Sequence, residues 1–386
     1  MSRMRKKNRR ALFSKNEGSV DRVLVVLTLG LILFGSIMVF SASAPYAANA
    51  HDGNAMYYFF RNLLFAAIGT VVLFLVSRID YRVYQRHAKL LYGLALLTCV
   101  LVFVPHVGQD INDSRRWISI GSFSFMPSDI LKIGAIIGLS AYLCTRDLEK
   151  NGTLGIFFRV MFFIGMTILP VAMQPNFSAV VVISASLIFI YILGGMRMRH
   201  LGIVFLLAIV GLFIAFFPYK GNYRLDRLLA VIDPMKDPLG RGWQLLQSLY
   251  AVSSGGLFGV GLGQGRQKFD YLAEEAHNDF IFSVICEELG FVGATLVLLA
   301  FVILLVRMAR ASASAKNNFG KLLGYGITFI VGFQMLVNIG VAIGLVPPTG
   351  ITLPFISYGG SSLVAMCVMM GIVLNLSRDE ANYDKG

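Results

Sequence analysis

Charged residues are scarce in this sequence. Asp, Glu, Lys and Arg make up 14% of the 386 residues, whereas hydrophobic residues make up 56%. Soluble domains carry about 25% charged residues, so this composition excludes an ordinary soluble enzyme and indicates a membrane protein. Cysteine is rare as well, and no Cys-x-x-Cys pair occurs among Cys99, Cys144, Cys286 and Cys367. We therefore expect neither a disulfide nor a zinc site.

Long apolar runs account for most of the chain. A spanning helix needs about 20 mostly apolar residues, and ten candidates are present, at residues 22–42, 57–77, 89–105, 128–145, 156–173, 176–194, 200–217, 280–306, 322–345 and 360–376. The sequence thus predicts an all-α polytopic membrane protein of about ten transmembrane helices, with a long loop at 218–279 between spans 7 and 8. We expect one membrane domain at 22–376, between short tails at 1–21 and 377–386.

Lys and Arg are distributed unequally between the two sides of this topology. Ten spans place both termini on one side, which carries the basic tail at 1–21 and most of the other Lys and Arg residues. The positive-inside rule then predicts that both termini are cytoplasmic and that the loop at 218–279 is extracytoplasmic. The net charge of +13 is explained by this topology and by contact with anionic membrane lipids, and we expect no nucleic acid partner.

Three loops on the predicted outer side interrupt the membrane pattern, at residues 106–127, 218–278 and 346–362. Irregular backbone at membrane depth is tolerated only against protein or a water-filled cavity, so these loops indicate one extracytoplasmic cleft. The glycine-rich run at 255–265 is either a weak phosphate-binding signal or a place where backbones pack closely. The apolar content of its loop predicts re-entrant or interfacial segments rather than disorder.

Ionisable residues gather between Tyr271 and Glu288, beside an apolar helix. Such groups next to lipid-embedded helix are functional candidates by default. Asp279 is the strongest, and it is either a helix N-cap or a general base. Helical geometry would put Asp279 on one face with Ser283, Cys286, Glu287 and Gly290, with Asp279 near water and Glu287 deep in the span.

Two further side chains flank Asp279. Glu274 and His277 could in principle join it in holding a divalent ion such as Mg²⁺ or Mn²⁺. Their spacing is not a secure metal-ligand pattern, so we assign no metal site, and no cofactor is required by the sequence.

A cationic group surrounds the start of the fourth span. It consists of Arg115, Arg116 and Lys132, and Asp129 lies three residues before Lys132. The bland interpretation is that these long side chains snorkel to the membrane surface. The functional one is that they bind a phosphate-bearing ligand at the outer mouth.

Taken together, several ordered motifs resemble those of the SEDS family (shape, elongation, division and sporulation) over nearly the whole chain. They are Arg116-Trp117-Ile118, Pro127-Ser128, Gln174-Pro175, Gln247-Ser248-Leu249, Gly255-Gly256-Leu257, Asp279-Phe280-Ile281-Phe282, Glu287-Glu288-Leu289-Gly290, Pro348-Thr349-Gly350 and Pro354 to Ser362. Gly261-Leu262-Gly263 with Gln267-Lys268 is more similar to the division (FtsW) branch than to the elongation (RodA) branch. The family pattern differs at Asp129, where glutamate is usual, at Asn176, where aspartate is usual, and around Glu274, where the spacing changes.

The resemblance implies a peptidoglycan glycosyltransferase that polymerises lipid II and releases undecaprenyl pyrophosphate. By the family motif Asp279 matches an essential aspartate, and Arg116 and Lys132 suit the pyrophosphate. The expected substrate-binding residues are Arg115, Arg116, Trp117, Lys132, Glu274, His277 and Ser361. The expected structural or coupling residues are Asp129, Glu287, Glu288, Pro354, Gly359 and Gly360.

The resemblance also implies partners and a place in the cell. The expected partners are a class B penicillin-binding protein, which supplies the transpeptidase, and other divisome proteins. The expected location is the bacterial cytoplasmic membrane, with an extracytoplasmic active cleft. The alternatives are a lipid II flippase or other transporter, an elongation-type polymerase, and a scaffold in which Asp279 is only a cap.

Overall fold

The computed structural model describes residues 19–105, 107–111, 114–120, 123–145, 153–215, 223–240, 242–269 and 272–383. Its long helices are α2 (Arg22–Ala50), α3 (Tyr57–Ser77), α5 (Ala88–Leu101), α6 (Pro127–Leu143), α7 (Thr153–Met173), α8 (Phe177–Leu193), α9 (Met198–Ala215), α12 (Ile281–Ala313), α13 (Asn318–Ala342) and α14 (Gly360–Tyr383). Shorter elements are α4 (Tyr81–Arg86), α10 (Tyr223–Ile232), η2 (Pro234–Lys236), α11 (Trp243–Ser254) and η3 (Ala273–His277).

Each of the ten predicted spans coincides with one long helix, and the predicted helical membrane protein is confirmed. In the described part of the chain, α2, α3, α7, α12, α13 and α14 are long and apolar enough to cross a membrane alone, while α5, α8 and α9 are shorter apolar helices. The fourth span, α6, has only 17 residues and includes Asp129 and Lys132. Most of the basic tail predicted at 1–21 lies outside the described residues, and α14 continues past residue 376 to Tyr383.

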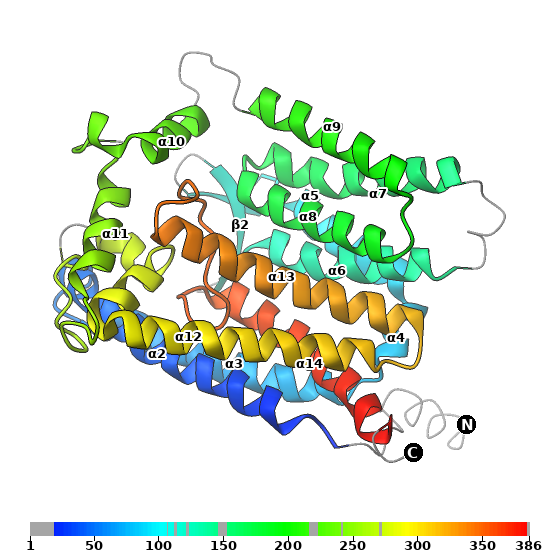
Figure 1. Cartoon of the computed structure of the whole chain (residues 1–386), viewed down its shortest axis with the longest axis horizontal. Coiled ribbons are helices and arrows are strands. Elements are labelled where there is room, and N and C mark those ends of the chain that lie inside the picture. The colour runs from blue at the N-terminus through cyan, green and yellow to red at the C-terminus, as the bar shows by residue number, and fades with distance from the viewer. Residues whose placement is uncertain are drawn as a thin grey trace.

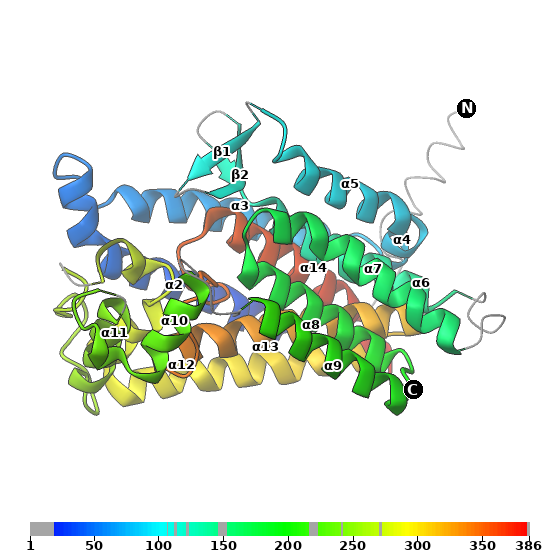
Figure 2. The ribbon, with the colours of Figure 1, turned by 90° about the horizontal axis from the view of Figure 1, so that it is seen from above.

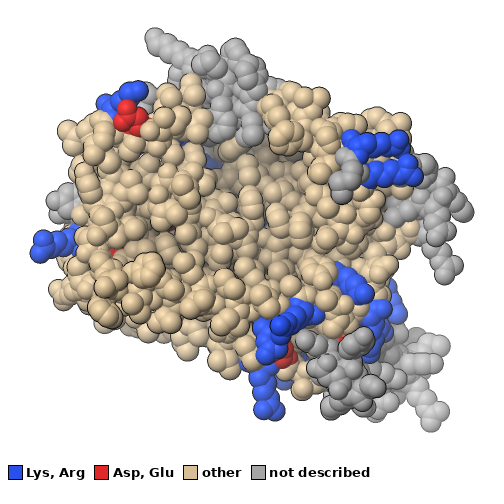
Figure 3. All heavy atoms as spheres, viewed as in Figure 1, with Lys and Arg blue, Asp and Glu red and all other residues tan. Residues whose placement is uncertain are grey.

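The helices run side by side, and α2 begins and α14 ends at the same end of the bundle (Figure 1). The opposite end, which we call the loop end, carries α10, α11 and the connection between α2 and α3 (Figure 2). On the face drawn in Figure 3, Lys and Arg lie toward the two ends of the bundle, with a broad uncharged band between them. This distribution suits a bundle whose middle faces lipid.

A small sheet lies between α5 and α6 in sequence, in the first of the three loops that interrupt the membrane pattern on the predicted outer side. It has three antiparallel strands in the order β1 (Gly108–Ile111), β2 (Ser114–Ile120) and β3 (Phe123–Phe125). The helical prediction did not include this sheet, because the segment is too short to show more than a few alternating residues. On β2, Arg116 shares a face with buried Ile118, whereas Arg115 and Trp117 share the other face.

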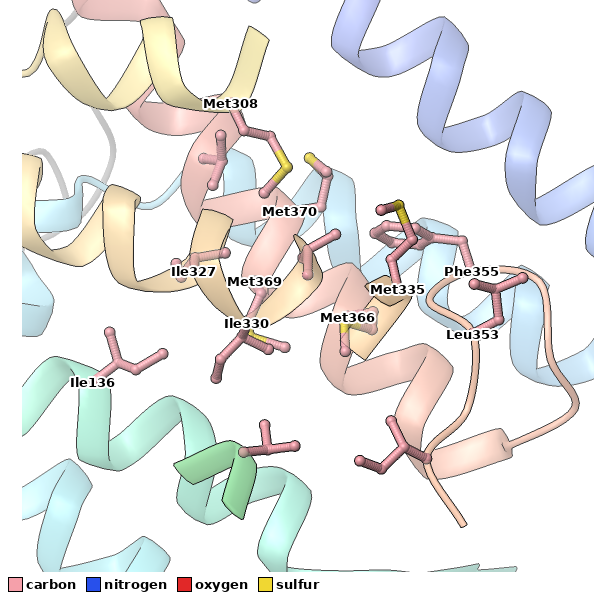
Figure 4. Close-up of a cluster of buried hydrophobic side chains, with 14 of the residues drawn as sticks. Ile136, Met308, Ile327, Ile330, Met335, Leu353, Phe355, Met366, Met369 and Met370 are labelled. Atoms are coloured by element: carbon pink, nitrogen blue, oxygen red, sulfur yellow. The ribbon is translucent and has the colours of Figure 1, made fainter. Parts of the chain in front are cut away.

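The core includes an irregular segment as well as helices. Leu353 and Phe355, in the connection between α13 and α14, pack with methionines of α12, α13 and α14 (Figure 4). Gly35 on α2 permits this packing, because a Cβ there would lie 2.5 Å from the Ile356 Cα. Residues 353–357 of this connection are therefore buried between α2 and the last two helices.

Helix α12 is interrupted at Gly290, and the glycine-rich run fills the interruption. Gly290 has φ 66° and ψ −167°, a conformation that favours glycine. Carbonyls of Glu287 and Glu288 accept hydrogen bonds from the backbone of Val260 and Gly261, at 2.9 and 3.0 Å. On the other side of the break, the amides of Phe291 and Val292 donate to the carbonyls of residues 256 and 257, at 2.9 and 3.1 Å.

The glycines of this run allow the backbones to touch. A Cβ at Gly255 would lie 1.9 Å from the Cys286 carbonyl oxygen, and a Cβ at Gly259 would lie 2.1 Å from that of Glu288. Close backbone packing, rather than phosphate binding, therefore accounts for these glycines.

Two carboxylates hold residues 266–268, which directly follow the glycine-rich run, against α12. The Glu287 carboxylate accepts hydrogen bonds from the backbone amides of Arg266 and Gln267, the shorter at 2.7 Å. The Glu288 carboxylate is fully buried and pairs with Lys268 Nζ at 2.6 Å, while Ser41 on α2 donates to it at 2.6 Å. The pair thus ties α2, α12 and the run together.

Breaking this ion pair should be costly. Lys268→Met leaves the Glu288 carboxylate buried without a cation, and we expect it to lower the free energy of unfolding by about 3–5 kcal/mol. The double variant Lys268→Met/Glu288→Gln should recover most of that loss, because the buried charge is gone. Thermal unfolding in detergent micelles measures both.

The matched control is Lys236→Met. Lys236 pairs with Asp233 at 3.7 Å, but its side chain is 82% exposed, so its loss should change stability by less than about 1 kcal/mol. Equal effects of the two single variants would contradict a stabilising role for the Lys268–Glu288 pair.

Candidate functional site

Asp279 lies in the turn between η3 and α12, at the loop end. Helix α12 begins at Ile281 with Phe280 as its N-cap, and no side chain caps it. The capping interpretation of Asp279 and its place on the helical face of Glu287 are therefore wrong, because the helix begins two residues later. The Asp279 carboxylate instead accepts a hydrogen bond from the backbone of Gly350, whose φ is 74°.

The connection at 346–359 fixes the backbone around Asp279. Asn338 on α13 donates from its side-chain nitrogen to the carbonyls of Asp279, at 3.0 Å, and Ile351, at 2.8 Å. The Tyr358 amide donates to the His277 carbonyl at 2.9 Å. Ser357 donates from its hydroxyl to the carbonyl of residue 278 at 2.7 Å. Residues 277–279 are thus joined to the connection by their main-chain carbonyls, which leaves the Asp279 carboxylate to face Gly350.

The surroundings of Asp279 favour its protonated form. Burial, followed by the nearby negative charge of Glu275, raises the pKa of Asp279 to about 7. The positive charge of Arg227 on α10 and the Gly350 hydrogen bond act in the opposite direction. A carboxylate with a pKa near neutral can take and return a proton under ordinary conditions, which is what general base catalysis requires.

His277 is a poor proton acceptor in this structure. It is buried against Tyr58 and Tyr358, with ring centroids 4.6 and 5.3 Å apart. Burial lowers the pKa of His277 to about 4, so the ring is neutral at physiological pH. Its neighbours are aromatic rings from α3 and the 346–359 connection, which indicates a packing role.

A second polar cluster lies at the start of α6. Lys132 Nζ pairs with Asp129 Oδ1 at 2.8 Å, and Ser361 on α14 donates to Asp129 Oδ2 at 3.1 Å. Both charged residues are more than nine-tenths buried. An apolar cavity of about 460 Å³ adjoins them and is lined by α3, α4, α5, α6, β3 and α14, with Asp129 and Ser361 among its few polar lining residues.

The described structure resembles proteins of one known family. The family model for FtsW, RodA and SpoVE, described as a cell cycle protein, matches residues 21–382. The chain belongs to this family. Stage V sporulation protein E of Bacillus subtilis is 41% identical over 363 residues, which cover 93% of this chain and 97% of the relative. The probable peptidoglycan glycosyltransferase FtsW of Trichlorobacter lovleyi is 38% identical, over 92% of this chain and 93% of the relative.

Solved structures of FtsW/RodA/SpoVE relatives have the same fold. A chain from a peptidoglycan synthase complex that coordinates polymerization and crosslinking superposes with a TM-score of 0.77 at 29% identity, covering 93% of this chain and 98% of that one. The rod shape determining protein RodA of Thermus thermophilus gives 0.67 at 27% identity, over 93% and 97%. The SEDS resemblance is thereby confirmed.

The site residues that the sequence predicted do not form one cluster in the structure. Asp279 and His277 lie beside the 346–359 connection, while Lys132, Asp129 and Ser361 form the second cluster. Arg115 and Arg116 lie on β2, the former exposed and the latter half-buried, as is Trp117. Glu274 lies in η3, but its side chain is outside the described part of the structure.

The residues predicted to be structural or coupling partners lie in buried contacts. The Glu287 and Glu288 carboxylates contact the glycine-rich run and the residues that follow it, so their contacts are separate from those of Asp279. Pro354 is buried, and Gly360 lies against Phe65, where a Cβ would be 2.5 Å from the ring. Gly359 has more room, with its nearest neighbour at 3.3 Å.

Metal binding finds no support among the described side chains, where no three His, Cys, Asp or Glu residues converge. The suggested trio of Glu274, His277 and Asp279 stays a hypothesis, because the Glu274 side chain is outside that part.

Sequence reasoning missed Asn338, Arg227 and Glu275. Asn338 stands inside an apolar helix, where a buried polar residue calls for a partner, and that signal could have drawn attention to it. Arg227 had no comparable signal, because only the fold brings α10 beside Asp279. Glu275, in contrast, lies four residues before Asp279 in the same acidic segment, but it was not singled out there.

Removing the Asn338 side chain should destabilise this site. Asn338→Leu leaves the buried carbonyls of Asp279 and Ile351 without their donor, and we expect a loss of about 1–3 kcal/mol in the free energy of unfolding. Leu336→Ala, at a position that is 62% exposed, serves as the control and should cost clearly less. Thermal unfolding would contradict the bridging role of Asn338 if the two variants behaved alike.

Proposed function

We propose that this chain is a peptidoglycan glycosyltransferase that polymerises lipid II at the outer face of the cytoplasmic membrane. The observation that carries the proposal is Asp279, a half-buried carboxylate whose pKa is raised to about 7 at the loop end of the bundle. Family membership and relatives named as probable peptidoglycan glycosyltransferases support the reaction class. In this orientation both termini are cytoplasmic and the loop end is extracytoplasmic.

The proposed reaction is an inverting glycosyl transfer. Asp279 takes the proton of the acceptor sugar's 4-hydroxyl as the hydroxyl oxygen attacks the anomeric carbon of the donor disaccharide. A new glycosidic bond forms, and the bond from that carbon to the pyrophosphate oxygen breaks. Undecaprenyl pyrophosphate leaves with the bonding electrons.

The other parts of the site have corresponding roles in this proposal. Lys132 and Arg116 stabilise the negative charge that develops on the pyrophosphate. The apolar cavity beside Asp129 and Ser361 accepts part of the polyprenyl tail, since most of its lining is apolar and Asp129 in that lining pairs with Lys132. Arg115, Trp117 and Glu274 contribute to the walls around the sugars, whereas buried His277 packs against Tyr58 and Tyr358 instead.

We further propose a partner and a cellular role. The synthase complex that this chain resembles joins polymerization to crosslinking, which supports a class B penicillin-binding protein as the partner. The FtsW relatives support a role in division and septal wall synthesis beside other divisome proteins, and the SpoVE and RodA relatives keep the sporulation and elongation roles as alternatives.

Replacing the proposed base tests the reaction. Asp279→Asn should abolish polymer formation from lipid II by the chain with its partner, while expression and thermal unfolding stay unchanged. Polymer is detected by gel separation of labelled glycan strands. Full polymerisation by Asp279→Asn would exclude Asp279 as the base, and lipid II crossing liposomes without polymer would favour the flippase.

The pH dependence follows from the pKa of Asp279. The base must be ionised, so the rate of polymerisation should fall as the pH drops through about 7. Glu275→Gln removes a negative charge, lowers the pKa of Asp279 and should move the profile to lower pH. Arg227→Gln removes a positive charge and should move it to higher pH. Shifts in the same direction would contradict the assignment of Asp279 as the titrating base.

A further inference from the structure

We propose that the turn at residues 256–263 inserts its apolar side chains into the lipid–water interface on the extracytoplasmic side of the cytoplasmic membrane. The exposed large side chains of this turn are Leu257, Phe258, Val260 and Leu262, which are 65%, 79%, 44% and 53% exposed. With Phe291 on α12, which is 66% exposed, we call them the apolar turn patch. This inference does not depend on the catalytic proposal.

The position of the patch along α12 places it at the edge of the hydrocarbon core. The turn is hydrogen-bonded to α12 on both sides of the break at Gly290. It therefore lies at the same level along the axis of α12 as Gly290. A rise of about 1.5 Å per residue puts Gly290 about 26 Å above Arg307 and about 30 Å above Arg310. The hydrocarbon core of a bilayer is about 30 Å thick. Gly290 therefore lies near one boundary of the core when the two arginines lie at the other.

The lower part of α12 has the surface of a lipid-facing helix. Residues 291–306 include no charged residue, and the side chains of Leu296, Leu299 and Val302 are 62%, 51% and 51% exposed. At the far end Arg307 pairs with Asp21 at 3.5 Å, which marks the opposite membrane boundary. The apolar turn patch continues this surface upward, since residues 256 and 257 bond directly to Phe291 and Val292.

Polar residues follow the patch along the chain. Gln264 and Arg266 follow the patch in sequence and are exposed, while Glu287 fixes the backbone of Arg266. A segment in which apolar side chains are followed by a guanidinium group is typical of the membrane interface, where acyl chains meet the lipid headgroups. The buried Lys268–Glu288 pair anchors this segment to α12, so the patch is held at one depth.

Tryptophan placed in the patch reports its surroundings. Phe258→Trp, in the full chain reconstituted into phosphatidylcholine vesicles, should show blue-shifted emission and strong quenching by lipids brominated near the top of the acyl chain. Aqueous iodide should quench it weakly. The signal of Trp117 and Trp243 is subtracted with the unaltered chain measured in parallel.

Leu239→Trp is the matched control. Leu239 is 83% exposed, as prominent as Phe258, but it follows Lys236 and Asp237, and the Lys236 side chain is 82% exposed. It should therefore be quenched by iodide and little by brominated lipid. Quenching of Trp at 258 by iodide to the same extent as at 239 would overturn the proposal. Protection of position 258 from both quenchers would overturn it too, because protein rather than lipid would then cover the patch.

Discussion

Every buried backbone amide and carbonyl in this bundle needs a partner, and that requirement governs its irregular parts. No water is available inside a lipid-embedded bundle. The backbone amides and carbonyls at an interrupted helix must therefore form hydrogen bonds with another segment of the chain. At Gly290 the glycine-rich run supplies both the missing donors and the missing acceptors. At the other irregular place, Asn338 and the 346–359 connection satisfy the carbonyls of residues 277–279.

These two sets of hydrogen bonds give different surroundings to acidic residues that lie close together in the sequence. Glu287 and Glu288 follow Asp279 by about two turns of helix, but their carboxylates face the glycine-rich run and its lysine. The Asp279 carboxylate faces Gly350, in the neighbourhood of Arg227 and Glu275. The Glu287 carboxylate is held by backbone amides and the Glu288 carboxylate by Lys268, whereas Asp279 has a pKa of about 7, which suits proton transfer.

The turn beside Gly290 and the backbone of Asp279 are held in place by several bonds, and an apolar cavity lies near the start of α6. The turn beside Gly290 is clamped by a buried ion pair and four backbone hydrogen bonds, and the Asp279 backbone is held by Asn338. Near the start of α6, a compensated cation lies beside an apolar cavity. A ligand with a charged head and a lipid tail matches this arrangement, because the charged and apolar parts of the protein are adjacent but distinct.

The sequence by itself determined the membrane class, the ten helical segments and the family motifs, and it singled out Asp279 as the candidate base. Those features depend on hydropathy and on short motifs, and each of these can be read from a single segment of the sequence. The small sheet, the break at Gly290, the role of Asn338 and the neighbours of Asp279 were decided only by the tertiary structure. The small sheet is local, but its strands are too short to show a clear alternating pattern. The other features depend on contacts between segments far apart in sequence, such as α10 with the 346–359 connection, and hydropathy does not record which segments pair.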